Sequence, residues 1–316
     1  MNEVSAITTN FTRLLALDAG QTGIRARVYD ADSRAHELPE LPGVRNNAPL
    51  VPQWADTIRT CIAMIDGLTP LSVAVGSTGC GARHLASDVL AGVADLGVQR
   101  VALAHDSISN YLGALDYEPG VIVASGTGVI TYGVGAAATA RVDGWGSQLG
   151  DAGSGFSIGR AALTAVMRDY DGRGAPTALT PMISQDFDDL EQAYLDVQND
   201  PDWVRRIASY SKVVAGLAPS DQVARDIIRR AAADLVHAVA TAAHRVGEDG
   251  PEGTKVATLG GVFRSPELKS DFAALLAERL PAARIVAPLG DALDGSCKLF
   301  GIPLDSPLRG KVSYAG

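Results

Sequence analysis

Apolar and polar positions near the start of the chain alternate in ways typical of strands. RLLALD (13–18) is a short apolar run that predicts a buried strand, and IRARVYD (24–30) alternates apolar with charged residues like a half-buried strand. The Gly-rich turn AGQTG (19–23) joins them into a predicted hairpin. LSVAVG (71–76) and RVALA (100–104) predict two further strands. The first hundred residues therefore predict a sheet.

The opening pattern returns at residue 121. VIVASGTGVITYGVG (121–135) is again an apolar strand, a turn containing Gly and Thr, and a second strand. Setting Gly128 against Gly23 places the two hairpins roughly 105 residues apart. Strand–Gly–strand segments are common in α/β proteins, but two turns that share Thr and Gly after a buried strand are less so. We interpret the pair as a weak internal repeat of one structural unit.

Apolar residues spaced near 3.6 predict the helices. These cover residues 53–66 (after a loop marked by Pro39, Pro42, Pro49 and Pro52), 157–171, 201–215, 221–246 and 266–280. Another helix is predicted to begin at Asp106, which has the chemistry of an N-cap. KVATLGGVF (255–263) predicts a strand that enters a Gly-Gly turn, ARIVAP (283–288) a last strand and ALDGSCKLFG (292–301) a last helix. The fold class is α/β, with a mixed sheet in each half and helices around it.

Charge and cysteine content exclude several classes of function. The formal net charge is -9 and Lys and Arg form no cluster, so we expect no nucleic-acid partner. Cys61, Cys80 and Cys297 form no C-x-x-C pair and the five His lack ligand spacing, so neither a zinc site nor a disulfide framework is indicated. The N-terminus lacks the apolar core of a signal peptide, and no apolar run approaches the ~20 residues of a membrane span. We expect a cytoplasmic protein with no membrane partner.

Three Gly-rich loops have the composition of phosphate-binding loops: AGQTG (19–23), SGTG (125–128) and GDAGSG (150–155). Gly lets the backbone approach a phosphate closely, so that several N–H groups converge on it. The chain has no G-x-x-x-x-G-K-[ST] motif and no G-x-G-x-x-G at a strand-to-helix turn, which excludes a P-loop enzyme and leaves a Rossmann site unsupported. Each loop alone is weak evidence of phosphate binding, and the three together favour it.

Three aspartates lie beside these loops or at strand ends. Asp18 ends the first buried strand, where it either caps its own turn or holds Mg²⁺ through water beside phosphates. Asp106 lies where a strand ends and a helix starts, so a simple N-cap is as good an interpretation as a catalytic role. Asp151 lies in a Gly-rich loop near Trp145, a combination more typical of a site than of a surface turn.

Five segments together resemble the N-acetylglucosamine kinase family. They are LALDAGQTG (15–23), LAHDS (103–107), VIVASGTG (121–128), GWGSQLGDAGSGFSIGR (144–160) and TLGGVF (258–263). That family belongs to the BadF/BadG/BcrA/BcrD-type ATPases of the actin-like superfamily. The resemblance spans nearly the whole chain and implies a two-lobed actin-like (ribonuclease H-like) fold. We expect an N-terminal lobe over 1–115, joined by 300–316, and a C-terminal lobe over 116–299.

The resemblance also assigns roles to residues, and it implies ATP and Mg²⁺ as cofactors. The matching positions are Gly20, Gln21 and Thr22 for the first phosphate loop, Ser125, Gly126, Thr127 and Gly128 for the second, Gly260 and Gly261 for the adenosine, and Asn46, Gly144, Trp145, Gly146 and Asp151 for the sugar. Asp18 matches the Mg²⁺-side carboxylate and Asp106 the general base. Asn47 is an alternative to Asn46. The implied activity is ATP-dependent phosphorylation of the primary hydroxyl of N-acetylglucosamine or glucosamine, by an enzyme that we expect to be a homodimer.

Two segments depart from the family pattern. Ala152 stands where the family usually has Glu, and this loss of a carboxylate near the sugar slightly favours the neutral N-acetylglucosamine over glucosamine. STGCGAR (77–83) places Cys80 and Arg83 in a loop that usually holds small residues. Arg83 either meets an anionic group of the substrate or is solvated, and we expect it to be solvated.

Two other functions fit parts of the pattern. A regulatory ATPase of the acyl-CoA dehydratase activator type binds an iron–sulfur cluster through paired cysteines, which this chain lacks. A non-catalytic sugar sensor would have a damaged catalytic set, whereas Asp18, Asp106 and Thr127 are all in place. The sequence therefore favours a sugar kinase.

Overall fold

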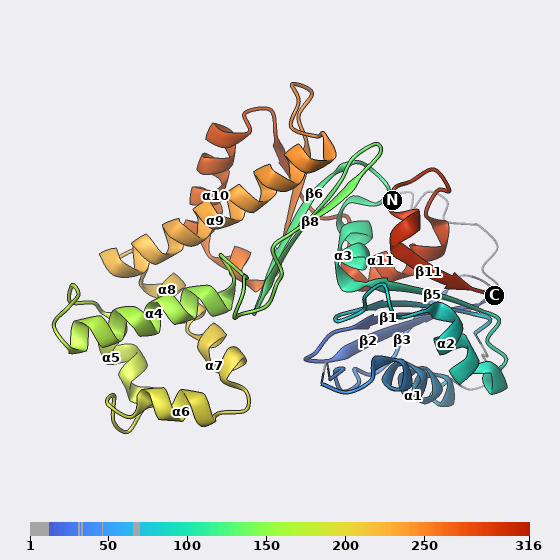
Figure 1. Ribbon diagram of the computed structural model, residues 1–316, viewed down its shortest axis with the longest axis horizontal. Helices are drawn as coiled ribbons and strands as arrows, with labels where there is room; N and C mark the ends of the chain where they lie inside the picture. The colour runs from blue at the N-terminus through green and yellow to red at the C-terminus, as the bar shows by residue number, and fades with distance from the viewer. Residues whose placement is uncertain (1–12, 31, 33, 46, 66–69) are drawn as a thin grey trace. The chain divides into compact units, whose positions relative to one another are not determined.

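The computed structural model describes residues 13–30, 32, 34–45, 47–65 and 70–316 (Figure 1). The chain divides into two compact units, Met1–Glu118 together with Pro288–Gly316, and Pro119–Ala287. Each unit has a mixed sheet, flanking helices and its own hydrophobic core, which confirms the predicted α/β class. None of the helices in the described part of the chain combines the length and apolar character that a membrane span requires.

The first unit is built on a sheet with the strand order β11-β5-β4-β1-β2-β3. Its strands are β1 (Leu14–Ala19), β2 (Ile24–Tyr29), β3 (Ala35–Glu37), β4 (Ser72–Ser77), β5 (Arg100–His105) and β11 (Val312–Ala315). β1, β4 and β5 run parallel, whereas β2, β3 and β11 pair antiparallel with their neighbours. β4 is buried throughout and β2 is buried at alternate positions, as their apolar patterns predict.

Helices cover both faces of this sheet, with α1 and α2 on one face and α3 and α11 on the other (Figure 1). Their bounds are Leu50–Ala63 for α1, Ala86–Gly92 for α2, Asp106–Leu115 for α3 and Ala292–Cys297 for α11. Short 3₁₀ turns lie at Ala94–Leu96 (η1), Leu299–Gly301 (η4) and Arg309–Lys311 (η5). α1 begins before the predicted residue 53, because Pro52 is tolerated in a first turn, where its missing N–H would have no helical partner.

The two compact units differ from the expected lobe bounds at residues 116–118 and 288–299, which lie in the first unit. α11 packs against α3 so closely that side chains are excluded at the contact. A Cβ on Gly295 would lie 1.7 Å from the Ser109 carbonyl oxygen, and one on Gly113 would lie 1.9 Å from the Asp291 carbonyl oxygen. This close packing of two helices that lie about 180 residues apart in the sequence holds residues 288–299 in the first unit.

The second unit is built on a sheet with the strand order β10-β9-β6-β7-β8. Its strands are β6 (Gly120–Ser125), β7 (Val129–Val134), β8 (Thr139–Val142), β9 (Lys255–Leu259) and β10 (Arg284–Val286). Both predicted hairpins are present, as β1–β2 and β6–β7. In each, the first strand also pairs in parallel with a later strand, β4 or β9.

The remaining helices belong to this second unit. They are α4 (Gly155–Tyr170), α5 (Leu179–Ile183), α6 (Ala193–Asn199), α7 (Trp203–Ser209), α8 (Ser211–Leu217), α9 (Gln222–Val246) and α10 (Pro266–Arg279), with 3₁₀ turns at Ser184–Asp186 (η2) and Gly261–Arg264 (η3). α9 ends at Gly247 in the left-handed conformation, as its sequence predicts. The helix predicted over 201–215 is instead the pair α7 and α8, because a tighter bond from Tyr210 N–H to the Ile207 carbonyl interrupts the helix.

Candidate functional site

Three loops of the first unit leave its sheet at one edge. The parallel register pairs Ala19 of β1 with Ser77 of β4, and Ser77 with His105 of β5. The segments that follow these strands therefore emerge side by side. Ligands of open α/β sheets bind outside this carboxyl edge of the parallel strands.

The first of these loops is the predicted phosphate loop at Gly20–Thr22. Gly20 N–H donates to the Gly23 carbonyl (3.1 Å), and Val44 N–H donates to the Gly20 carbonyl (2.9 Å). A Cβ on Gly43 would lie 2.2 Å from the Gln21 carbonyl oxygen, so the loop rests directly on this glycine. Gln21 and Thr22 are exposed. The loop is thus a fixed turn whose outer surface is open to a ligand.

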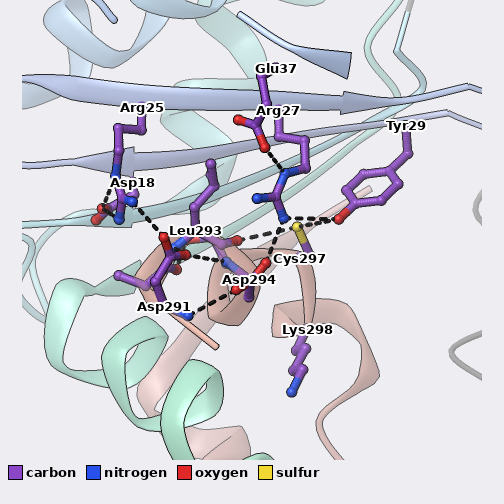
Figure 2. A network of polar contacts seen from close by, with 12 residues as sticks. Asp18, Arg25, Arg27, Tyr29, Glu37, Asp291, Leu293, Asp294, Cys297 and Lys298 are labelled. Carbon is purple, nitrogen blue, oxygen red and sulfur yellow. Dashed lines mark hydrogen bonds and ion pairs between the residues drawn. The ribbon is translucent and has the colours of Figure 1, made fainter. Parts of the chain in front are cut away.

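Asp18 lies at the end of β1, opposite Arg25 of β2 in the hairpin register (Figure 2). Arg25 donates to the Asp18 carboxylate from Nη2 (2.6 Å) and Nε (3.2 Å), and from Nη1 to Asp291 (2.5 Å). Burial raises the pKa of Asp18, and the charges of Asp106 and Asp291 act in the same direction, while Arg25 opposes them. Arg25 therefore offsets much of the negative charge beside the first phosphate loop.

The ion pairs continue from Asp291 into α11 (Figure 2). Asp291 is the N-cap of this helix and forms a capping box with Asp294. Arg27 donates to Asp294 (2.6 Å) and to Glu37 (2.5 Å). The network thus ties the start of α11 to the hairpin that carries Asp18.

Asp106 is the first residue of α3, as predicted, but it is not the N-cap, which was one of the two interpretations that its position left open. The N-cap is His105, whose Nδ1 accepts from the Ser107 N–H (3.1 Å). The same Nδ1 lies 2.8 Å from Asp106 Oδ1. Because the extended backbone of His105 brings its ring over the helix start, the Asp106 carboxylate is not used for capping. Its side chain is 28% exposed at the carboxyl edge of the sheet.

The second unit carries the other predicted phosphate loop, Ser125–Gly128, between β6 and β7. It packs on the start of α4: Gly155 N–H donates to the Gly126 carbonyl (2.8 Å) and Phe156 N–H to the Thr127 carbonyl (3.0 Å). Ser125 is fully buried and its hydroxyl donates to the Gly153 carbonyl (2.9 Å). Ser125 is therefore an internal support of the turn, whereas Thr127 is exposed.

Asp151 lies against this loop from the predicted sugar segment. Its Oδ1 accepts from the Gly146 N–H (3.2 Å), and a Cβ on Gly128 would lie 2.8 Å from its Oδ2. Asp151 is 7% exposed, and burial raises the pKa of its carboxyl group. The structure thus brings three predicted parts of the site together within this unit: Gly146, Asp151 and the Ser125–Gly128 turn.

Asp143 holds the predicted sugar segment in place, a role that the sequence analysis did not identify. Its carboxylate accepts from the N–H groups of Gly144 (2.7 Å), Asp151 (2.8 Å) and Ala152 (2.9 Å). The signal in the sequence was an Asp directly before a Gly-Trp-Gly run, since Asp readily accepts from nearby backbone N–H groups in turns. Trp145 is 57% exposed at the tip of this loop, with the Arg141 guanidinium 4.6 Å from its ring centroid.

The predicted adenosine loop lies beside the second phosphate loop. β6 and β9 are parallel neighbours, so the loops that follow them leave the sheet together. Gly260 has a φ of +94°, and a Cβ there would lie 2.2 Å from the Ser125 carbonyl oxygen. Only glycine fits this position. Gly261 has open space around it.

The predicted site residues therefore fall into two groups, one in each unit. The first unit holds Asp18, Gly20, Gln21, Thr22 and Asp106, and the second holds Ser125, Gly126, Thr127, Gly128, Gly144, Trp145, Gly146, Asp151, Gly260 and Gly261. Asn46 lies outside the described residues, and its neighbour Asn47 is exposed in the turn before α1. Their roles toward a ligand stay predictions.

The cysteines have the environment of structural thiols. Cys61 and Cys80 are buried and Cys297 is partly buried, all as free thiols. Burial raises the pKa of Cys61 and Cys297 to about 11 and that of Cys80 to about 12. The described part of the chain has no group of three or more His, Cys, Asp or Glu side chains placed to hold a metal ion.

Comparisons with known proteins agree with this arrangement. The sequence profile of the BadF/BadG/BcrA/BcrD ATPase family matches residues 55–293. An N-acetylmuramic acid/N-acetylglucosamine kinase from Clostridium acetobutylicum is 26% identical over 241 residues, which cover 71% of this chain and 75% of that protein.

Solved structures match almost the whole chain. A candidate N-acetylglucosamine kinase from Chromobacterium violaceum superposes with a TM-score of 0.73 at 25% identity, covering 92% of this chain and 99% of that one. A ROK family glucokinase from Streptomyces griseus, in complex with glucose and AMPPNP, has a TM-score of 0.51 at 17% identity and covers 91% of this chain and 98% of its own. These matches confirm the predicted actin-like α/β fold. The chain is a member of the BadF/BadG/BcrA/BcrD ATPase family.

Proposed function

We propose that the protein is an ATP-dependent sugar kinase that phosphorylates the primary hydroxyl of N-acetylglucosamine or a close derivative. The observation that carries the proposal is the position of Asp106. Its carboxylate lies at the carboxyl edge of the first sheet, near enough to Asp18 to influence its ionisation, and the helix cap does not use it. The relative from Clostridium acetobutylicum, named as an amino-sugar kinase, supports the same conclusion.

Asp106 would act as the general base. The sugar oxygen attacks the γ-phosphorus of ATP, the bond from that phosphorus to the β–γ bridging oxygen breaks, and the hydroxyl proton passes to the Asp106 carboxylate. ADP and the sugar phosphate are the products. A base in this position contributes typically ~10²–10⁴-fold to the rate.

Backbone N–H groups of the turns Gly20–Thr22 and Ser125–Gly128 would bind the phosphates of the nucleotide, except those of Gly20 and Gly126, which already donate to the Gly23 and Gly128 carbonyls. Gly260 and Gly261 would border the adenosine. Both phosphate loops are held by hydrogen bonds behind them, so they need little reorganisation on binding. In the sugar segment, Asp151 would accept hydrogen bonds from ring hydroxyls, with Gly144, Trp145 and Gly146 beside it.

Magnesium, when bound with ATP, neutralises charge on the phosphates. Asp18 is the residue that would hold it, through water. A single carboxylate already paired with Arg25 fits a hydrated ion carried mainly by phosphates, since Mg²⁺ keeps several of its waters in such sites. The homodimer and the cytoplasmic location expected from the sequence stay predictions.

The nature of residue 152 supports an acetamide over a free amine. Ala152 is exposed and has no carboxylate of its own, so its side chain adds no negative charge that would attract an ammonium group. The buried cysteines, with raised pKa values, give no support to the iron–sulfur activator.

An ADP-release assay with N-acetylglucosamine, glucosamine and glucose tests the proposal. We expect turnover of N-acetylglucosamine with the highest kcat/KM of the three sugars. A clear preference for glucosamine would contradict the argument from Ala152, and turnover of none of the sugars would contradict the function.

A further inference from the structure

A pocket of about 250 Å³ lies within the first unit and belongs to neither phosphate loop. It is lined by Ala48, Pro49, Leu50, Gly79, Arg83 and His84. These residues come from two segments, the start of α1 and the loop that follows β4. The second segment contains Arg83, at one of the positions where the chain departs from the family pattern.

Buried contacts fix the two segments against each other. Trp54 of α1 is fully buried, and its indole N–H donates to the Ser77 hydroxyl at the end of β4 (2.9 Å). The Trp54 and His84 rings meet edge to face with their centroids 5.3 Å apart. Gly79 has a φ of +70°, which lets the loop turn back toward α1. The pocket is therefore a feature of the folded unit and not a gap between mobile loops.

The polar side chains that line this pocket, Arg83 and His84, can both donate hydrogen bonds. Arg83 is exposed and has no hydrogen-bond or ion-pair partner within the described part of the chain. His84 Nδ1 accepts from the Gly81 N–H (3.0 Å), so a neutral His84 ring carries its proton on Nε2 and can donate from there. None of the six lining residues carries a carboxylate. A pocket that offers a cation and hydrogen-bond donors, and no carboxylate, favours an anionic group of a ligand.

The pocket lies beside the expected position of the reaction. Its β4 loop leaves the sheet between the loop after β1 and the start of α3, where Asp106 lies. Burial raises the pKa of Cys80 in this loop to about 12, and the negative charge of Asp106 acts in the same direction. A sugar whose primary hydroxyl faces Asp106 therefore has this loop as a neighbour of its ring.

We infer that this pocket is a subsite for a carboxylate carried on a short substituent of the amino sugar, bound by the Arg83 guanidinium with His84 as a second donor. The inference rests on the proposed function and names its substrate class, an acidic amino sugar. The planar guanidinium fork binds a carboxylate through two parallel hydrogen bonds. Arg83 then meets an anionic group of the substrate, whereas the sequence favoured a side chain that is only solvated.

N-Acetylmuramic acid is a suitable probe, because it is N-acetylglucosamine with a lactyl carboxylate attached through an ether. Its methyl ester is a matched control of nearly the same shape without the charge. The quantity to measure is the ratio of kcat/KM for the acid to kcat/KM for the ester. Losing the charged contact in Arg83→Met should lower this ratio by about 10- to 100-fold.

Two further variants separate the charge of the pocket from general damage. Ala48→Asp places a negative charge on an exposed lining position and should also lower the ratio. Arg34→Met is the matched control: Arg34 is an exposed arginine after β2, at the opposite edge of the sheet, and should leave the ratio unchanged.

The outcomes distinguish this inference from the proposed function. A wild-type ratio near one, or a ratio that Arg83→Met leaves unchanged, overturns the subsite while the kinase function stands. If no sugar is phosphorylated, the proposed function fails, and calorimetric binding of the acid and the ester to the wild type and Arg83→Met still decides the inference. Equal binding of the acid and the ester by the wild type would then overturn it.

Discussion

The two hairpins of the molecule have the same strand arrangement but different surroundings. The β1–β2 hairpin is bordered by charged side chains, with Asp18, Arg25 and Asp291 joined in one partly exposed network. The turn of the β6–β7 hairpin is bordered mostly by backbone: the start of α4 donates to its carbonyls and Gly260 lies directly on Ser125, with the Asp151 carboxylate beside Gly128. Charge-changing substitutions should therefore affect mainly the first unit, and changes of backbone shape mainly the second.

The largest effect is expected at Asp106. Asp106→Asn keeps the size of the side chain but cannot accept the proton, so kcat for N-acetylglucosamine should fall by roughly 10²-fold or more. KM for the sugar should change much less. Steady-state ADP release measures both constants, and Asp88→Asn, at an exposed position of α2, is the control. A near wild-type kcat in Asp106→Asn would remove Asp106 from the role of base.

Gly260 tests the dependence of the second hairpin on backbone shape. Gly260→Ala combines an unfavourable positive φ with a Cβ that would lie 2.2 Å from the Ser125 carbonyl oxygen, so we expect a loss of about 2–4 kcal/mol in the free energy of unfolding. Gly261→Ala should be nearly neutral, because nothing lies near its Cβ. Urea unfolding of the two variants gives the comparison. Equal stability of both would contradict the close packing of the two loops.

Arg25 tests the role of charge in the first hairpin. Arg25→Gln leaves the Asp18 carboxylate without its partner and so leaves more negative charge beside the phosphate loop. We expect KM for MgATP to rise by about 10-fold. Stability should change by only roughly 0–1 kcal/mol, because the pair is partly exposed. Arg27→Gln is the control, since it breaks ion pairs of the same network without contacting Asp18. Equal changes in KM in both variants would assign the effect to general loosening.

Asp151 gives the smallest effect, seen as a function of pH. Burial raises its folded-state pKa above the ordinary value of 3.8, so its favourable contribution is full below 3.8 and is lost as the pH rises through the raised value. Asp151→Asn keeps an oxygen to accept from Gly146 and has no charge to bury. The variant should gain stability relative to the wild type as the pH rises through this window, in urea unfolding at a series of pH values. A difference that does not vary with pH would contradict the burial of this carboxyl group.

The sequence predicted features that depend on neighbouring residues and failed where distant segments meet. Buried strands, Gly turns and the end of α9 at Gly247 follow from local patterns, and the structure contains them. The roles of Asp143 and Arg25 were not identified from the sequence. Asp291 is distant from Arg25 along the chain, and the contact between Asp143 and Asp151 forms only when the loop between them closes back. The packing of α11 on α3 likewise rests on glycines whose contacts no periodicity reveals.

The capping of α3 had a different cause of error. His105 and Asp106 both have groups that accept from a first-turn N–H, and the sequence favours Asp because Asp is the more common cap. The backbone of His105 is extended at the end of β5, which places its ring over the helix start. The Asp106 carboxylate is thereby left out of the helix cap, and its Oδ1 lies 2.8 Å from His105 Nδ1.

Identification of the product tests the central claim most directly. The protein is incubated with N-acetylglucosamine and MgATP, and the product is analysed by ³¹P–¹H correlation NMR. We predict a phosphomonoester coupled to the two protons of the exocyclic methylene carbon, formed together with ADP and absent with Asp106→Asn over the same time. A phosphorus signal coupled to a ring proton, or ADP and free phosphate with no sugar ester, would contradict the account.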